Sequence, residues 1–123
     1  MLMFREVIFY ESPEGQKPIH RFLDKLDGKQ AKKVAWTLLL VEEQKVIPSK
    51  YFKKMANTDD LWEVRVASGS NIFRLLGFYD GAKLVVISHA FQKKTQKTPK
   101  KEIEKALRIK NEYFKQKEKG SKK

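Results

Sequence analysis

The Asp80-Gly81 dipeptide is the feature that most limits the fold of this chain. It separates two apolar segments, residues 71–79 (NIFRLLGFY) and 83–91 (KLVVISHAF), which are rich in β-branched and aromatic side chains. Such segments favour strands, and Asp-Gly between them favours a tight turn because glycine adopts positive φ freely. The combination predicts a β-hairpin in the second half of the chain.

A third strand is predicted just before the hairpin. Apolar and charged side chains alternate along residues 61–66 (LWEVRV), which is the period of a strand with one buried face. The apolar positions are Trp62, Val64 and Val66, and the charged ones are Glu63 and Arg65. Residues 68–70 (SGS) supply the next turn, so three strands form an antiparallel meander. Residues 4–10 (FREVIFY) predict one further, N-terminal strand.

Apolar residues recur at helical spacing in three other segments. The first begins near Lys17, and the second follows Asp27, with Gln30 placed three residues later as in a capping box. The apolar stripe of this second helix consists of Val34, Ala35, Leu38 and Leu39. The third opens at Thr98-Pro99, an N-cap followed by a proline in the first turn.

These elements predict one α+β domain. It combines a small antiparallel meander and an N-terminal strand with helices packed on one face of the sheet: a helical hairpin and a C-terminal helix. No repeat or linker interrupts residues 1–117, which we assign to a single domain, and the basic tail 118–123 is expected to fray into solvent.

The charge of the chain is large and uneven. The net charge is +12, but residues 1–92 hold 14 basic against 11 acidic side chains, whereas residues 93–123 hold 13 against 4. A cationic field of this kind attracts polyanions, and nucleic acid is the favoured partner. An acidic protein or an anionic membrane surface would also fit.

The composition excludes several classes of protein. The chain has no cysteine, which rules out disulfides and thiolate metal sites, and its two histidines make no metal constellation. No apolar run approaches the length needed to span a bilayer, and no signal peptide is recognisable. We therefore expect a soluble, cytoplasmic protein that needs no cofactor and no metal.

Two arginines, Arg65 and Arg74, occur inside predicted strands rather than in loops. A guanidinium fork matches phosphate oxygens, and several cations around one phosphate stabilise the extra negative charge of a transition state. Arg65 is expected on the open face of the sheet. A purely structural role is the alternative, in which each arginine is solvated or pairs with Glu63 across the sheet. Their placement on neighbouring strands near a lysine cluster favours phosphate binding.

A lysine cluster follows the last predicted strand, where residues 92–101 contain five lysines and no acidic residue. Crowded cations lower the proton affinity of a lysine, which suits a general acid or base. A solvated surface is the alternative for each lysine pair. The candidate lysines are Lys53, Lys54, Lys93, Lys94 and Lys97.

His89 and Phe91 share one face of the last predicted strand with Val85 and Ile87. Both can be core residues. Alternatively, Phe91 at the strand end offers a ring on which a base can stack, worth about 1–3 kcal/mol per base. His89 is then a candidate contact to the same substrate.

The order of these motifs resembles the RelE/HigB-like toxins of bacterial toxin–antitoxin modules, most closely the phage-derived HigB branch. The resemblance runs from about Phe4 to Tyr113. Its most specific part is the block 61–104, which holds two strand arginines, the Asp-Gly hairpin and the H-x-F-x-K-K-T-x-K-T-P sequence that opens the last helix.

The resemblance implies a ribosome-dependent mRNA interferase that enters the decoding site of the small ribosomal subunit. In such enzymes the ribose 2′-hydroxyl attacks the adjacent phosphate without a metal, leaving a 2′,3′-cyclic phosphate and a 5′-hydroxyl. It also implies a cognate helix-turn-helix antitoxin as partner, with operator DNA bound only through the joint complex, and no membrane.

Carried over by position, the resemblance implies that Arg65 and Arg74 bind the scissile phosphate and that Lys93 or Lys94 assists the leaving oxygen. Phe91 matches the part of the site that stacks on a base. Lys53 and Lys54 match a lysine-bearing region more loosely. The general base stays open among His89, Glu63, Lys54 and Lys94. A basic RNA- or ribosome-binding module without catalysis, or a dock for an acidic partner, would use the same surface.

Overall fold

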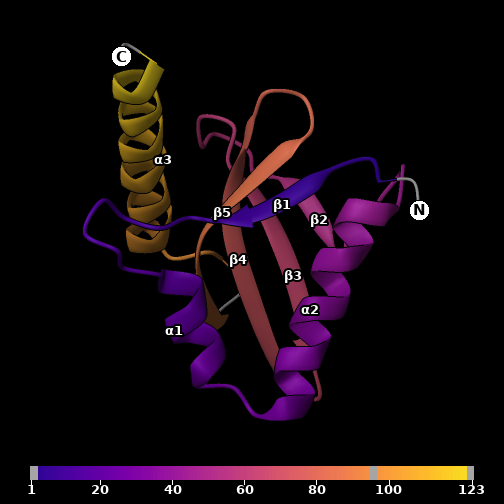
Figure 1. Ribbon diagram of the computed structural model, residues 1–123. Helices are drawn as coiled ribbons and strands as arrows, with labels where there is room; N and C mark the ends of the chain where they lie inside the picture. The colour runs from indigo at the N-terminus through magenta and orange to yellow at the C-terminus, as the bar shows by residue number, and fades with distance from the viewer. Residues whose placement is uncertain (1–2, 95–96, 122–123) are drawn as a thin grey trace.

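The computed structural model describes residues 3–94 and 97–121 of the chain (Figure 1). Five strands and three helices follow one another in it. Their order is β1 (Glu6–Phe9), α1 (Pro18–Asp24), α2 (Gly28–Glu43), β2 (Phe52–Lys54), β3 (Trp62–Ser68), β4 (Asn71–Asp80), β5 (Leu84–Lys93) and α3 (Lys100–Ser121). The α+β class predicted from the sequence is confirmed.

The strands form one mixed sheet in the order β1-β5-β4-β3-β2. The predicted meander is confirmed, because β3, β4 and β5 pair antiparallel in succession. The N-terminal strand β1 pairs in parallel with β5 and is shorter than the predicted 4–10. The short edge strand β2, which pairs antiparallel with β3, is an addition that no alternation in the sequence indicated.

Helix α2 begins with the predicted capping box. The Asp27 carboxylate accepts from the backbone N–H of Gln30 at 2.7 Å, and the Gln30 side chain accepts from the Asp27 N–H at 3.1 Å. The predicted apolar stripe is only half right, because Ala35 and Leu39 are exposed. The buried residues are Val34, Thr37, Leu38 and Val41. The helix is apolar on two sides, and only contact with the sheet decides which side is buried.

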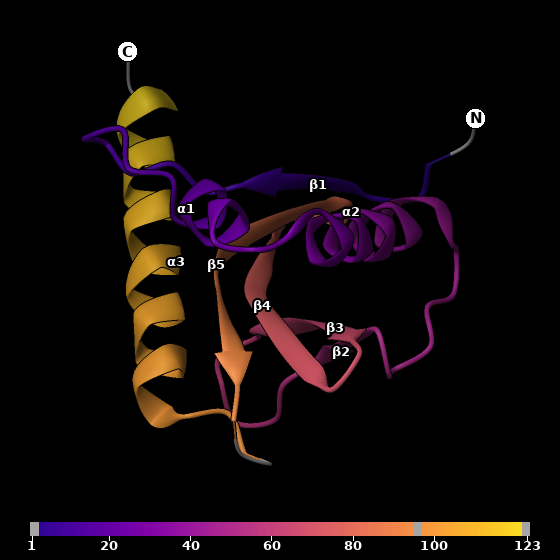
Figure 2. The ribbon, with the colours of Figure 1, turned by 90° about the horizontal axis from the view of Figure 1, so that it is seen from below.

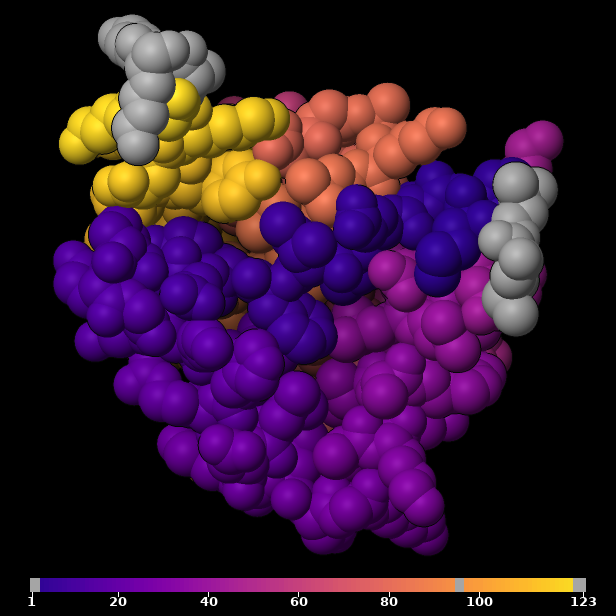
Figure 3. Space-filling view, viewed as in Figure 1, coloured from indigo at the N-terminus to yellow at the C-terminus, as the bar shows by residue number. Residues whose placement is uncertain are grey.

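The prediction that all helices pack on one face of the sheet is wrong. Helices α1 and α2 cover one face, whereas α3 lies against the other (Figure 2). In the space-filling view, α1 and α2 form a broad surface over the first face (Figure 3). The alternation of β4 and β5 explains this, since Leu75 and Ile87 point into the α1–α2 core while Leu76 and Val86 point into the α3 core. Strands that are apolar on both faces need cover on both.

Helix α3 differs from its prediction at both ends. The Thr98 hydroxyl does not cap it but donates to Glu63 on β3, and the Pro99 carbonyl accepts the first helical bonds. At the other end, residues 118–121 are helical rather than frayed, and residues 122–123 lie outside the described part. Asp80 explains part of this order, because it accepts from the Tyr113 hydroxyl at 2.7 Å and from the Lys117 ammonium at 2.8 Å.

Gly77 allows β4 and β5 to approach closely. A Cβ built at this position would lie 2.5 Å from the Val86 carbonyl oxygen, which is closer than any side chain tolerates. The β4–β5 register shifts between Leu76 and Gly77, and the Ser88 hydroxyl there donates to the Leu76 carbonyl at 2.9 Å. This irregularity separates the regular hairpin near Asp80 from the part of the sheet that carries the arginines.

Candidate active site

Three functional side chains lie in one row across the centre of the sheet. Arg65 on β3 is opposite Arg74 on β4, which is opposite Phe91 on β5. Directly opposed residues of antiparallel strands point to the same face. The row is therefore on the face that carries α3, as Arg65 alternates with Val64 and Val66 of the α1–α2 core. The two arginines that the sequence placed on neighbouring strands are side by side.

Two lysines join this row. Lys93 follows Phe91 by two residues on β5, and Lys53 is opposite Glu63 on β2, so both lie on the same face as Arg65. Burial lowers the pKa of Lys93, and the positive charges of Arg74, Arg65 and Lys53 lower it further, against an opposing effect of Glu63. The cations around Lys93 act in the direction expected of crowded positive charges, and burial is the larger cause.

Arg74 is part of a buried ion pair. Its guanidinium contacts the Glu63 carboxylate, and these two residues are only 5% and 1% exposed. The second carboxylate contact comes from the Thr98 hydroxyl at 3.2 Å. Among the described residues, Glu63 Oε1 and Arg74 Nε have no hydrogen-bond partner. The alternative of pairing with Glu63 thus holds for Arg74, whereas the side chain of Arg65 is half-buried and forms no ion pair within the described chain.

His89 is a core residue, only 2% exposed. Its Nε2 lies 3.3 Å from Glu102 Oε1 on α3, and its Nδ1 lies 3.1 Å from the Ser88 hydroxyl. Burial, together with the charges of Lys105 and Arg108, lowers the pKa of His89 to about 4. Its ring is neutral at pH 7 and links β5 to the first turn of α3. Direct contact with a substrate would require this packing to open.

The buried histidine makes the stability of the fold pH-dependent. His89 titrates near pH 6.5 when unfolded and near pH 4 when folded, so the unfolded state binds more protons between these values. We expect the free energy of unfolding to fall as the pH drops from about 6.5 to about 4, by up to about 1.4 kcal/mol per pH unit. The carboxyl groups of Asp60 and Asp80, whose pKa values are lowered by bonds to lysines, titrate below this window.

Urea denaturation at half-unit pH steps measures this dependence. The His89→Gln variant, which keeps a polar side chain beside Glu102 but does not titrate, should show a flatter profile between pH 6.5 and 4. Equal slopes for the two proteins would contradict the burial of a neutral His89.

The remaining candidates are divided between the row and the rest of the surface. Phe91 is half-buried, with its ring 6.0 Å from that of His89. Lys94 and Lys97 are exposed where the chain passes from β5 to α3. Lys54 is separated from the row, because it is opposite Trp62 on the other face and pairs with Asp60 at 2.7 Å.

In the part of the chain that the structure covers, no three His, Cys, Asp or Glu side chains are grouped so that they could hold a metal ion. Within the same residues, no helix combines the length and the apolar character that a membrane crossing needs.

Comparison with known protein families identifies the family of this chain. Residues 21–111 match the family described as Phage derived protein Gp49-like (DUF891). The chain belongs to this family. Gp49-like proteins are toxins of toxin–antitoxin systems, which makes this chain toxin-like and implies a cognate antitoxin. No curated protein matches the sequence.

The Gp49-like segment contains the whole row and the residues around it, from Lys53 to Glu102. Two contacts were not predicted from the sequence. They are the hydrogen bond that Thr98 donates to Glu63 and the contact between Glu102 and His89. A signal for Glu102 was present, since it lies in the first turn of a helix that follows the histidine strand directly. Nothing in the sequence indicated that Thr98 would bond to Glu63 instead of capping α3.

Proposed function

We propose that this Gp49-like protein is a ribosome-dependent mRNA interferase of the RelE/HigB type, neutralised by a cognate antitoxin. The observation that carries the proposal is the row of Arg65, Arg74 and Phe91, with Lys53 and Lys93 on the same face. Guanidinium and ammonium groups around one position suit a phosphodiester, and an aromatic ring beside them suits a base.

The proposed reaction needs such cations together with a general acid and a general base. The 2′-oxygen of one nucleotide forms a bond to the adjacent phosphorus, the bond from phosphorus to the 5′-oxygen breaks, and the products are a 2′,3′-cyclic phosphate and a 5′-hydroxyl. A base takes the proton of the 2′-hydroxyl, and an acid gives one to the leaving 5′-oxygen. The cations stabilise the additional negative charge on the phosphate oxygens in between.

The structure supports different roles for the members of the row. Among the described residues, the Arg65 guanidinium has no ion-pair partner and suits a phosphate, whereas Arg74 already neutralises Glu63. Lys93 combines a lowered pKa with a place beside both arginines, and we assign proton transfer to the leaving oxygen to it. Lys94 at the strand end is the alternative acid. Lys53, Lys97 and Phe91 hold the neighbouring nucleotides.

The partners follow from the same proposal. The substrate is mRNA on the small ribosomal subunit, and the antitoxin is a helix-turn-helix protein through which the complex binds operator DNA. The toxin itself then contacts RNA and the antitoxin only.

A non-catalytic RNA-binding module is the second candidate. Glu63 and His89, two of the possible general bases, are both buried and have protein partners. A surface with cations but no accessible base would bind RNA without cutting it.

Conditional expression followed by mapping of mRNA ends separates the two functions. The interferase should produce new 5′-hydroxyl ends inside coding regions within minutes of induction, whereas the same message without a start codon should stay intact. Growth arrest with uncut messages would favour the binding module, and cutting of both messages would contradict ribosome dependence.

A further inference from the structure

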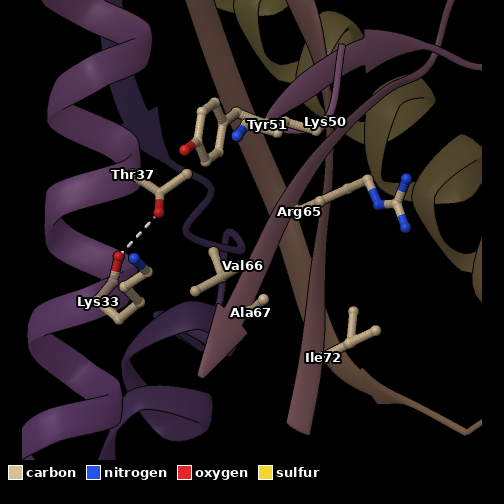
Figure 4. A pocket seen from close by; sticks show the side chains of 8 residues that line it. All are labelled: Lys33, Thr37, Lys50, Tyr51, Arg65, Val66, Ala67 and Ile72. Carbon is tan, nitrogen blue, oxygen red and sulfur yellow. Dashed lines mark hydrogen bonds between the residues drawn. The ribbon is translucent and has the colours of Figure 1, made fainter. Parts of the chain in front are cut away.

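A basic groove lies between α2 and the free edge of β3. Two adjoining hollows of about 410 and 320 Å³ form it, and they share Lys33 and Ala67. The larger one lies beside the β3–β4 turn, and the smaller one extends along β3 toward Tyr51 (Figure 4). We call this feature the α2 groove. It shares only Arg65 with the arginine row, and none of the roles assigned above uses its other residues.

The cations of the α2 groove are not neutralised by the protein. Within residues 3–94 and 97–121, no carboxylate lies within ion-pair distance of any of them. Lys29 is moreover in the first turn of α2, where the helix dipole disfavours a positive charge. The placement of Lys29 is unfavourable for the helix, and an external anion is the better explanation for this group of cations. The four cations are Lys29, Lys32, Lys33 and Lys50.

Two aromatic rings accompany these lysines. Trp36 is 46% exposed although it is a large apolar side chain, and its ring forms a T-shaped pair with that of Tyr51 at a centroid distance of 5.7 Å. The Lys33 ammonium lies 4.6 Å from the Trp36 ring centre, and the Lys50 ammonium lies 5.0 Å from that of Tyr51. Interleaved cations and rings are the surface on which single-stranded nucleic acid binds, with phosphates on the cations and bases on the rings.

The groove is continuous with the arginine row around the edge of the sheet. Strand β2 pairs only with residues 62–64 of β3, so residues 66–68 have no strand on that side within the described chain. The smaller hollow at this edge is lined by Thr37 on α2 and also by Arg65. Figure 4 shows the Arg65 side chain extending away from α2, so that its head lies on the other face. One flexible strand can therefore contact both regions.

We propose that the α2 groove binds single-stranded RNA, namely nucleotides that flank the one held at Arg65. The link to Arg65 rests on the proposed function, whereas binding in the groove does not. An acidic protein segment is the competing occupant. RNA fits better, because the walls offer lysines and two rings while the exposed aliphatic side chain of Leu39 lies outside both hollows.

Fluorescence anisotropy with a fluorescein-labelled 12-mer of 2′-O-methyl-uridine tests the proposal. This probe has no free 2′-hydroxyl, so binding is measured whether or not the protein is a nuclease. The slope of log K against log salt is negative, and the Lys33→Ala/Lys50→Ala variant should make it less steep by about 1.4, as expected for the loss of two phosphate contacts. Trp36→Ala should weaken binding at least about fivefold through lost stacking.

The matched control is Lys83→Ala/Lys115→Ala, which removes the same charge at exposed positions on the β4–β5 turn and on α3. It should leave the slope nearly unchanged. If Lys33→Ala/Lys50→Ala does not fold, Lys29→Ala/Lys32→Ala removes two groove charges that make no contact with a ring. Equal losses in groove and control variants would overturn the proposal, since the probe would then bind through net charge alone.

Two further results complete the test. A dodecamer of glutamate that binds more tightly than the RNA probe, and loses affinity in the groove variants, would overturn the proposal in favour of an acidic protein. Loss of RNA affinity in the groove variants, combined with intact messages after expression of the parent protein, would support the groove and reject the nuclease.

Discussion

Arg65→Ala is expected to abolish growth arrest and to slow mRNA cleavage by about 100- to 1,000-fold, the usual cost of removing one donor that stabilises a transition state. Within the described residues, the Arg65 guanidinium forms no ion pair, and it lies beside Arg74 and the Lys93 neighbourhood. Single-turnover cleavage on translating ribosomes measures the rate. The midpoint of thermal unfolding should change little, because no described ion pair is lost.

Arg65→Lys and Lys83→Ala are the controls for this result. Lysine keeps the charge but loses the bidentate geometry, so an intermediate rate is expected. Lys83 lies on the exposed β4–β5 turn, and its replacement should leave the rate unchanged. Full toxicity of a folded Arg65→Ala protein would reject the assignment of Arg65 to the phosphate.

Glu63→Ala is expected to destabilise the fold by about 3–5 kcal/mol, the cost of leaving one charge of a buried pair without its partner. Glu63 and Arg74 are almost fully buried, and the Thr98 hydroxyl depends on the same carboxylate. Urea denaturation at pH 7 measures the loss. Arg74→Ala should cost a similar amount, because it leaves the carboxylate unpaired instead.

The double variant Glu63→Leu/Arg74→Met separates the ion pair from catalysis. Replacing a whole buried pair by apolar side chains of similar volume is often neutral, so this protein should be much more stable than either single variant. If it cleaves mRNA normally, the ion pair of Glu63 and Arg74 contributes only to the stability of the fold. If it folds but is inactive, Arg74 or Glu63 takes part in the reaction. Additive losses in the two single variants and the double variant would contradict a direct interaction.

Local sequence patterns predicted most of the secondary structure. The alternation in residues 61–66, the hairpin at Asp80-Gly81 and the Asp27 capping box each depend on a few neighbouring residues. All three are present, and the turn of the hairpin comprises residues 81–83, because Asp80 still pairs with Leu84. The short strand β2 was missed for the same reason. Three residues show no recognisable period, and only pairing with β3 makes them a strand.

Only part of the candidate site could be predicted from local sequence patterns. Alternation along β3 placed Arg65 opposite to the α1–α2 core, and antiparallel order placed Arg74 beside it. The alternation of side chains did not predict which face of β4 carries Arg74, because both faces of this strand are apolar. Whether it met phosphate or Glu63 depended on how deeply α3 and the preceding loop cover that face.

By itself, the sequence determined the class of fold, the meander with its arginines on neighbouring strands, and the cationic end of β5, because each depends on spacing along the chain. Only the tertiary structure decided that α3 covers the second face of the sheet, that His89 and Arg74 are buried, and that Lys54 turns away from the row. Those outcomes depend on which surfaces exclude water together, and segments distant in sequence settle that jointly.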